Sequence, residues 1–126
     1  KSIFVRYRFV PRDGEHYLTT EELKAKGPGY LRDELSQRLA KGAVAFDWFA
    51  QIAGDGDRIE DPSIAWPVER KLVKLGTLAV VSLADDAATD KETLFLPGVP
   101  HAGIEAADPM LKLRTSAYPL SFGGRQ

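Results

Sequence analysis

The residues best suited to chemistry are an arginine and a tyrosine near the carboxyl end, Arg114 and Tyr118. They are four positions apart, so on a helix their side chains lie on neighbouring turns of one side. A guanidinium beside a phenol favours the phenolate, because the positive charge stabilises the anion. A phenolate is a hard anionic ligand suited to ferric iron. The alternative is that the pair has no chemical role and is a surface arginine beside a half-buried tyrosine.

The sequence predicts a helix of about three turns over residues 108–118, which would hold this pair. Asp108 is a good N-cap residue. Pro109 occupies the first helical position, where its missing N–H has no intrahelical partner to lose. Three apolar residues recur at the spacing of one helical face, namely Met110, Leu113 and Ala117.

Three apolar segments predict strands, because their residues alternate between two faces. They cover residues 2–10, 43–53 and 72–83. In the first, one face is expected to hold Ile3, Val5, Tyr7 and Phe9, and the other Phe4, Arg6, Arg8 and Val10. In the second, the face expected to form the core holds Val44, Phe46, Trp48, Ala50 and Ile52. In the third, the residues expected to share a face are Val73, Leu75, Thr77, Ala79, Val81 and Leu83.

Shorter elements are predicted between these strands. Thr19 and Glu22 form a capping-box pattern that indicates a short helix, and residues 30–41 indicate a second helix. The glycine- and aspartate-rich stretch 54–57 is expected to be a turn with solvated acidic side chains, since it lacks the spacing of a calcium loop. A short fourth strand or an extended segment is expected over 92–96.

The composition excludes several classes of protein. The chain has 126 residues and a formal net charge of −1, which gives no electrostatic case for binding nucleic acid or an anionic membrane. No apolar run approaches the roughly 18 residues that a membrane-spanning helix needs. Cysteine is absent, which excludes disulfides, thiolate metal sites and cysteine nucleophiles. No signal-peptide pattern opens the chain, and we expect a cytoplasmic location in preference to a periplasmic one.

The residues around the arginine–tyrosine pair resemble a known family. Three short motifs follow one another in the order found in the haem-proximal segment of the catalases. They are Gly103-Ile104-Glu105, Asp108-Pro109-Met110-Leu111 and Arg114-Thr115-Ser116-Ala117-Tyr118. The resemblance is closest to the catalase-related haem peroxidases. Further residues in the same order extend it over nearly the whole chain: Trp48, Gln51, Asp61-Pro62, Trp66-Pro67 and Leu75-Gly76.

This resemblance implies roles for several side chains. Tyr118 would be the axial ligand of the haem iron, Arg114 would pair with its phenolate oxygen, and Asp108 would orient Arg114. The other residues implied to bind or surround the cofactor are Arg8, Phe95, Pro97, Ser121 and Arg125. Arg125 would pair with a haem propionate, while Arg8 would belong to the hydrogen-bond network behind the tyrosine. Two positions depart from the usual pattern, because Arg8 replaces a common histidine and Leu96 replaces an aspartate.

The resemblance also implies a fold and an activity. The fold would be α+β, with three to four strands forming half of an eight-stranded antiparallel barrel, a helical insertion and a C-terminal haem-proximal helix. Residues 1–126 would form the C-terminal half of a catalase-like haem-binding domain. We expect a fragment of a longer chain, because the sequence begins within a strand and without methionine. The activity would be breakdown of hydrogen peroxide with haem b.

The acid–base residues of that reaction are not expected in this chain. Peroxide cleavage needs a distal histidine that moves a proton and an asparagine that orients the substrate. The chain contains no asparagine, and its two histidines, His16 and His101, fall in predicted turns or loops. We therefore expect the chain to supply the proximal ligand and to have little or no activity alone.

Two other functions are compatible with the sequence. A half barrel has bare strand edges, which favour pairing with another sheet. The chain could therefore be an interaction module that forms a homo-oligomer or binds a missing N-terminal half. A weaker alternative is a binder of some small ligand other than haem on the same fold.

Overall fold

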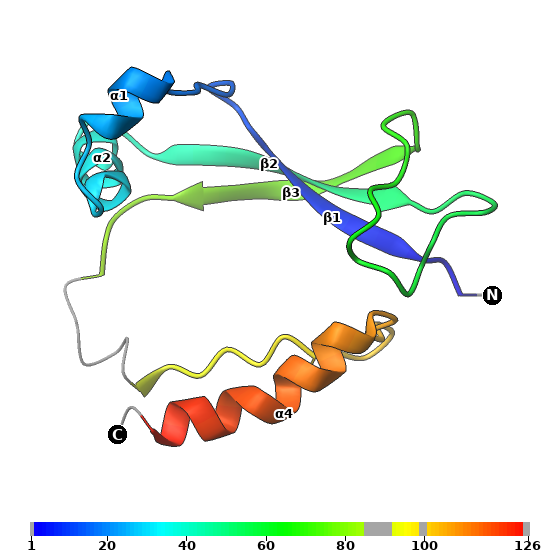
Figure 1. Ribbon diagram of the computed structural model, residues 1–126. Helices are drawn as coiled ribbons and strands as arrows, with labels where there is room; N and C mark the ends of the chain where they lie inside the picture. Colours follow the sequence, from blue (N-terminus) through cyan, green and yellow to red (C-terminus); the bar gives the residue numbers. More distant parts are fainter. Residues whose placement is uncertain (1, 85–91, 99–100, 125–126) are drawn as a thin grey trace. The chain divides into compact units, whose positions relative to one another are not determined.

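The computed structural model describes residues 2–84, 92–98 and 101–124. In chain order its elements are β1 (Val5–Pro11), α1 (Thr20–Lys24), α2 (Tyr30–Leu39), β2 (Val44–Ile52), β3 (Leu72–Val80) and α4 (Pro109–Gly123) (Figure 1). The chain divides into two compact units. The sheet unit comprises residues 6–51 and 72–84, and the helix unit comprises the described residues of 1–5, 52–71 and 85–126.

The three strands form one sheet in the order β1-β2-β3. β2 and β3 are antiparallel. β1 also runs against β2, since the Ala53 N–H donates to the Phe4 carbonyl and the Arg12 N–H donates to the Ala45 carbonyl, both at 3.0 Å. The α+β class and the three predicted strands are therefore confirmed, while closure into a barrel stays a prediction.

A β-bulge in β3 makes one face prediction wrong. Trp48 pairs with Gly76, but the next residue, Phe49, pairs with Lys74, so Leu75 has no partner on β2. An extra residue shifts the alternation of side chains by one position. Val73 therefore lies on the Trp48 face of the sheet, whereas Thr77 and Ala79 lie on the opposite face with Asp47 and Ala45.

The Trp48 face is apolar but forms only a thin core. The Phe9 ring stacks on Trp48 with centroids 6.0 Å apart, and the Tyr7 ring meets Trp48 edge-on at 5.2 Å. Tyr7 and Phe9 nevertheless keep about half of their surface exposed, at 49% and 50%. Among the described residues, only Ala50 and Trp66 are buried apolar side chains.

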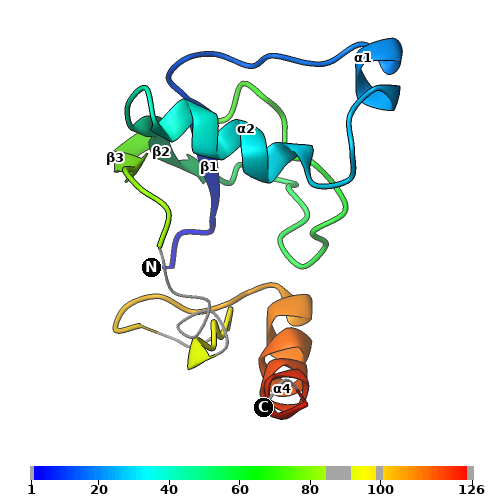
Figure 2. The ribbon, with the colours of Figure 1, turned by 90° about the vertical axis from the view of Figure 1, so that its left-hand side faces the viewer.

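The helices of the sheet unit follow their sequence signals. The Thr19 hydroxyl accepts a hydrogen bond from the Glu22 N–H, and the Glu22 carboxylate accepts one from the Thr19 N–H, so the capping box is confirmed. α2 ends two residues before the predicted boundary. α1 and α2 lie at the end of the sheet where β2 begins, and seen from that end α2 is in front of the strands (Figure 2).

The helix unit contains α4 and the loop that leads into it. α4 extends to Gly123, five residues past the predicted end, and passes through Pro119. The sequence favours an end at Tyr118, because proline lacks the N–H that would bond to the Thr115 carbonyl. Residues 93–96 belong to no helix or strand, so the alternative of a fourth strand is wrong there, while the alternative of an extended segment stays a prediction.

Candidate functional site

The amino end of α4 is fixed as the sequence predicts. Asp108 is the N-cap, and its Oδ1 accepts a hydrogen bond of 2.8 Å from the Met110 N–H. Pro109 occupies the first helical position. The Asp108 carboxylate thus satisfies a backbone donor that the helix itself leaves unpaired. Its expected second role, orienting Arg114, stays a prediction.

Arg114 and Tyr118 meet on one side of α4. Arg114 Nη2 donates a hydrogen bond to the Tyr118 hydroxyl oxygen. The guanidinium carbon lies 5.0 Å from the centroid of the phenol ring, so the cation also contacts the ring face. Arg114 is exposed, while Tyr118 is half-buried. The arrangement places a positive charge directly at the phenol oxygen, where it would stabilise a negative charge.

The loop before α4 packs tightly against the helix at Gly98. A Cβ atom on Gly98 would collide with the Thr115 hydroxyl and would lie 2.9 Å from the Leu111 carbonyl oxygen. The Thr115 hydroxyl donates to that same Leu111 carbonyl at 2.7 Å. Only glycine allows such a close approach of backbone to helix. Sequence reasoning missed this contact, although a glycine that follows a proline in the loop leading to the helix was its available signal.

The helix positions with the least exposure differ from the apolar face that the spacing suggested. Met110 and Leu113 are exposed. The half-buried positions recur at helical spacing and are Leu111, Thr115, Tyr118 and Phe122. Tyr118 is therefore on the same side of α4 as the residues that Gly98 contacts.

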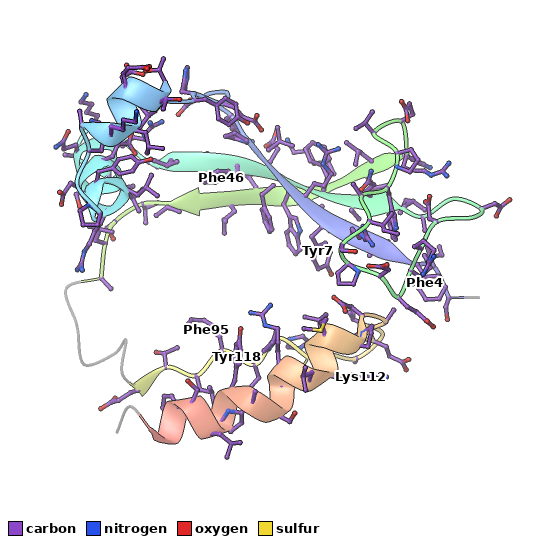
Figure 3. The ribbon with its side chains drawn as sticks, in the orientation of Figure 1. Phe4, Tyr7, Phe46, Phe95, Lys112 and Tyr118 are labelled. Carbon is purple, nitrogen blue, oxygen red and sulfur yellow. The ribbon has the colours of Figure 1, made fainter. Side chains whose placement is uncertain are left out.

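The other predicted site residues lie in several places. Phe95 and Pro97 are on the loop that runs beside α4, with Phe95 77% exposed and Pro97 half-buried (Figure 3). Ser121, the third residue after Tyr118, is exposed. Arg8 is exposed on β1, in the sheet unit. Arg125 lies outside the described residues.

The loop from residue 54 to 70 is held by an ion pair that the sequence did not suggest. Arg70 Nε and Nη2 donate to the two carboxylate oxygens of Asp57 at 2.9 and 3.0 Å, and the Gly54 N–H donates to the same carboxylate at 2.8 Å. The Asp57 side chain is only 5% exposed. The expectation of a solvated Asp57 is therefore wrong, and the hydrogen bonds to Asp57 raise the pKa of Arg70.

This loop and the start of α4 line an open groove of about 770 Å³ within the helix unit. Its apolar lining residues are Phe4, Ile59, Pro62, Ala107, Pro109 and Met110. Within the described ranges 2–84, 92–98 and 101–124, no group of three or more histidine, cysteine, aspartate or glutamate side chains could hold a metal ion. None of the helices in those ranges has the length and apolar character needed to cross a bilayer.

Known proteins resemble the chain in sequence and in structure. A catalase-related peroxidase from Synechococcus elongatus is 37% identical over 123 residues, which are 96% of this chain and 36% of that protein. A catalase-related peroxidase from Mycolicibacterium paratuberculosis is 39% identical over 124 residues, which are 94% of this chain and 38% of that protein. No family model matches the chain.

Solved structures share the fold. A fungal catalase superposes with a TM-score of 0.80 at 24% identity, covering 98% of this chain and 27% of that one. Catalase A from Saccharomyces cerevisiae superposes with a TM-score of 0.81 at 22% identity, covering 98% of this chain and 28% of that one.

The chain belongs to the catalase superfamily. The resemblance seen around residues 103–118 is thereby confirmed at the level of the family. The chain spans between 36% and 38% of the length of the two catalase-related peroxidases.

Proposed function

We propose that this chain acts in a haem protein that breaks down hydrogen peroxide, and that Tyr118 is the proximal ligand of the haem iron. The observation that carries the proposal is the hydrogen bond from Arg114 Nη2 to the Tyr118 oxygen, on the helix of a chain from the catalase superfamily. Catalase-related peroxidase is the name of both relatives, and it motivates hydrogen peroxide as the substrate.

The residues of the helix unit fit haem b. The donor is a single phenol oxygen with a cation at hydrogen-bonding distance, a combination that suits binding to ferric iron. The exposed ring of Phe95 and the half-buried Pro97 offer flat apolar surface beside the helix, which a porphyrin could cover. Haem, when bound, supplies the redox chemistry toward peroxide.

The chain's own residues would hold and tune the cofactor. Arg114 would stabilise negative charge on the Tyr118 oxygen and fix the orientation of the ring. Asp108 secures the start of the helix that carries both residues. By resemblance, Arg125 would pair with a haem propionate and Ser121 would lie near the cofactor. Proton transfer between the peroxide oxygens would depend on a histidine and an asparagine outside this chain.

The test is a titration of the chain with ferric haem, followed by the visible absorption spectrum. We expect a shifted Soret band for the unmodified chain and no such shift for Tyr118→Phe. Tyr17→Phe is the matched control, because Tyr17 belongs to the sheet unit, is exposed, and donates its hydroxyl hydrogen to Glu15 at 2.5 Å. A Soret shift that Tyr118→Phe leaves intact would remove Tyr118 from the proposal. The absence of any shift in the unmodified chain would favour a ligand other than haem.

A second candidate function is self-association, and the sheet favours it. The order β1-β2-β3 leaves β1 and β3 as the edges of the described sheet. Open edges and a half-exposed apolar face are features that promote pairing between chains. The mass of the chain in solution, measured by size-exclusion chromatography with light scattering, decides this point. A homodimer supports an interaction module, and a monodisperse monomer at high concentration contradicts it.

A further inference from the structure

The face of the sheet opposite Trp48 carries a concentration of positive charge. The hydrogen bonds at the two ends of β1 fix a register in which Arg8 lies opposite Phe49 and Arg12 opposite Ala45. Phe49 pairs in turn with Lys74 on β3. Arg8, Phe49 and Lys74 therefore form one row across all three strands, with a cation at each end and an aromatic ring between them.

A carboxylate already binds on this face. Asp47 Oδ1 accepts a hydrogen bond of 2.8 Å from Arg12 Nε and forms an ion pair of 2.9 Å with Lys74 Nζ. Arg12 Nη2 also donates to the Thr77 hydroxyl at 2.8 Å. The side chains of Arg12 and Lys74 keep 49% and 48% of their surface exposed, so both remain accessible. Asp47 thus binds two exposed cations, and Arg8 is a third exposed cation on the same face of the sheet. We call Arg8, Arg12 and Lys74 the basic face.

We propose that the basic face binds an acidic segment of a partner protein. Arg8 and Arg12 are four residues apart on the β1 side of the face, so their backbones are about 14 Å apart, which is also the spacing of carboxylates four positions apart in an extended peptide. Arginine suits such a partner because its planar fork pairs with carboxylates through two hydrogen bonds. The Asp47 contacts show that the geometry of this face accommodates a carboxylate.

Single-stranded nucleic acid is the other polyanion that a sheet face could bind, and the observations favour it less. Such sites stack successive bases on several aromatic rings. The basic face offers one ring, Phe49, which is itself half-buried. The net charge of the chain is −1, so long-range attraction to a polyanion is weak and recognition depends on the local charges.

The test measures binding of the folded chain to a labelled twelve-residue peptide of alternating glutamate and threonine, by fluorescence anisotropy at low salt. A peptide of alternating glutamine and threonine and a twelve-nucleotide oligothymidylate are the comparison probes. We expect the glutamate peptide to bind most tightly and its affinity to fall as salt is added.

The double variant Arg8→Gln with Lys74→Gln should weaken binding of the glutamate peptide by about tenfold, because it removes two exposed cations that would pair with peptide carboxylates. The matched control, Lys24→Gln with Lys41→Gln, removes the same charge from exposed positions around the two helices and should bind like the unmodified chain. Equal binding of the glutamate and glutamine peptides, or equal losses in the two double variants, overturns the proposal. Tighter binding of oligothymidylate replaces the acidic partner with a nucleic acid.

Discussion

The contact between Arg114 and Tyr118 concentrates the proposed chemistry in two side chains. The guanidinium both donates to the phenol oxygen and lies against the ring, so a single cation fixes the position and the charge environment of the donor. A group that supports a metal ligand in this way changes metal affinity by roughly 10- to 100-fold when it is removed.

Arg114→Met should therefore weaken haem binding by about tenfold or more, because the methionine stem keeps bulk but loses the charge and the hydrogen bond. The dissociation constant from a Soret titration checks this. Lys112 lies on the same helix (Figure 3), and Lys112→Met is the control because it removes a cation two positions before Arg114 in the sequence. Equal effects of the two substitutions would show that only the net charge of the helix matters.

Asp47 should make the stability of the sheet unit depend on pH. Hydrogen bonds and charges from Lys74 and then Arg12 lower the pKa of Asp47 below its ordinary value of 3.8. The ionised carboxylate therefore stabilises the folded state above pH 3.8, and this contribution is lost as the pH falls through the lower folded-state pKa.

The free energy of unfolding in urea, measured from pH 6 down to pH 2, tests this expectation. The unmodified chain should lose more stability over the acid range than Asp47→Asn, which has no carboxylate to protonate. Asp13→Asn, in the exposed turn after β1, should keep the acid dependence of the unmodified chain. An identical pH profile for Asp47→Asn and the unmodified chain would contradict a stabilising role for this ion pair.

The loop at Gly98 makes a close contact with α4 within the helix unit. The loop backbone lies against Leu111 and Thr115, on the side of α4 that also carries Tyr118. A side chain at position 98 has no space, so the loop or the helix would have to move.

Gly98→Ala should lower the free energy of unfolding by about 1–3 kcal/mol, the usual cost of forcing extra atoms into a packed site. Gly27→Ala is the matched control, because a Cβ atom at Gly27 would have nothing within 4 Å and the φ angle of Gly27 is not positive. Urea unfolding of both variants gives the comparison. Similar stabilities for the two variants would show that the Gly98 contact does not persist in solution.

β3 shows how an element can be predicted correctly and its faces wrongly. It begins at Leu72 as the alternating pattern predicts and ends at Val80, three residues before the predicted boundary, but the bulge at Leu75 reverses the orientation of the residues beyond it. The bulge places Lys74 on the same face as Asp47 and Thr77 and so completes the basic face.

The whole chain combines a catalase-like fold with very little buried apolar surface. Ala50 and Trp66 are the buried apolar side chains of its described part, whereas a domain of this length usually buries a substantial core. Association with another chain, or with a copy of this one, would add the missing burial.

We therefore expect the midpoint of thermal unfolding to rise with protein concentration, because association of folded chains stabilises them by mass action. Circular dichroism melts at 1, 10 and 100 µM test this. A midpoint that stays constant over this range would indicate that the isolated chain is a folded monomer, and it would count against self-association.

The sequence by itself determined the features that depend on neighbours along the chain. The cap at Asp108, the capping box at Thr19 and the meeting of Arg114 with Tyr118 all follow from spacings of two to four residues. The resemblance around these residues also indicated the family, which the relatives confirm.

Only the tertiary structure decided the features that join distant segments. The burial of Asp57 depends on Arg70, thirteen residues later, and the close approach of Gly98 depends on the helix face it meets. Which face of the sheet each β3 side chain lies on depends on how β3 pairs with β2. Spacing within one segment cannot specify these contacts, because each is set by the shape and register of a partner that folding alone brings into place.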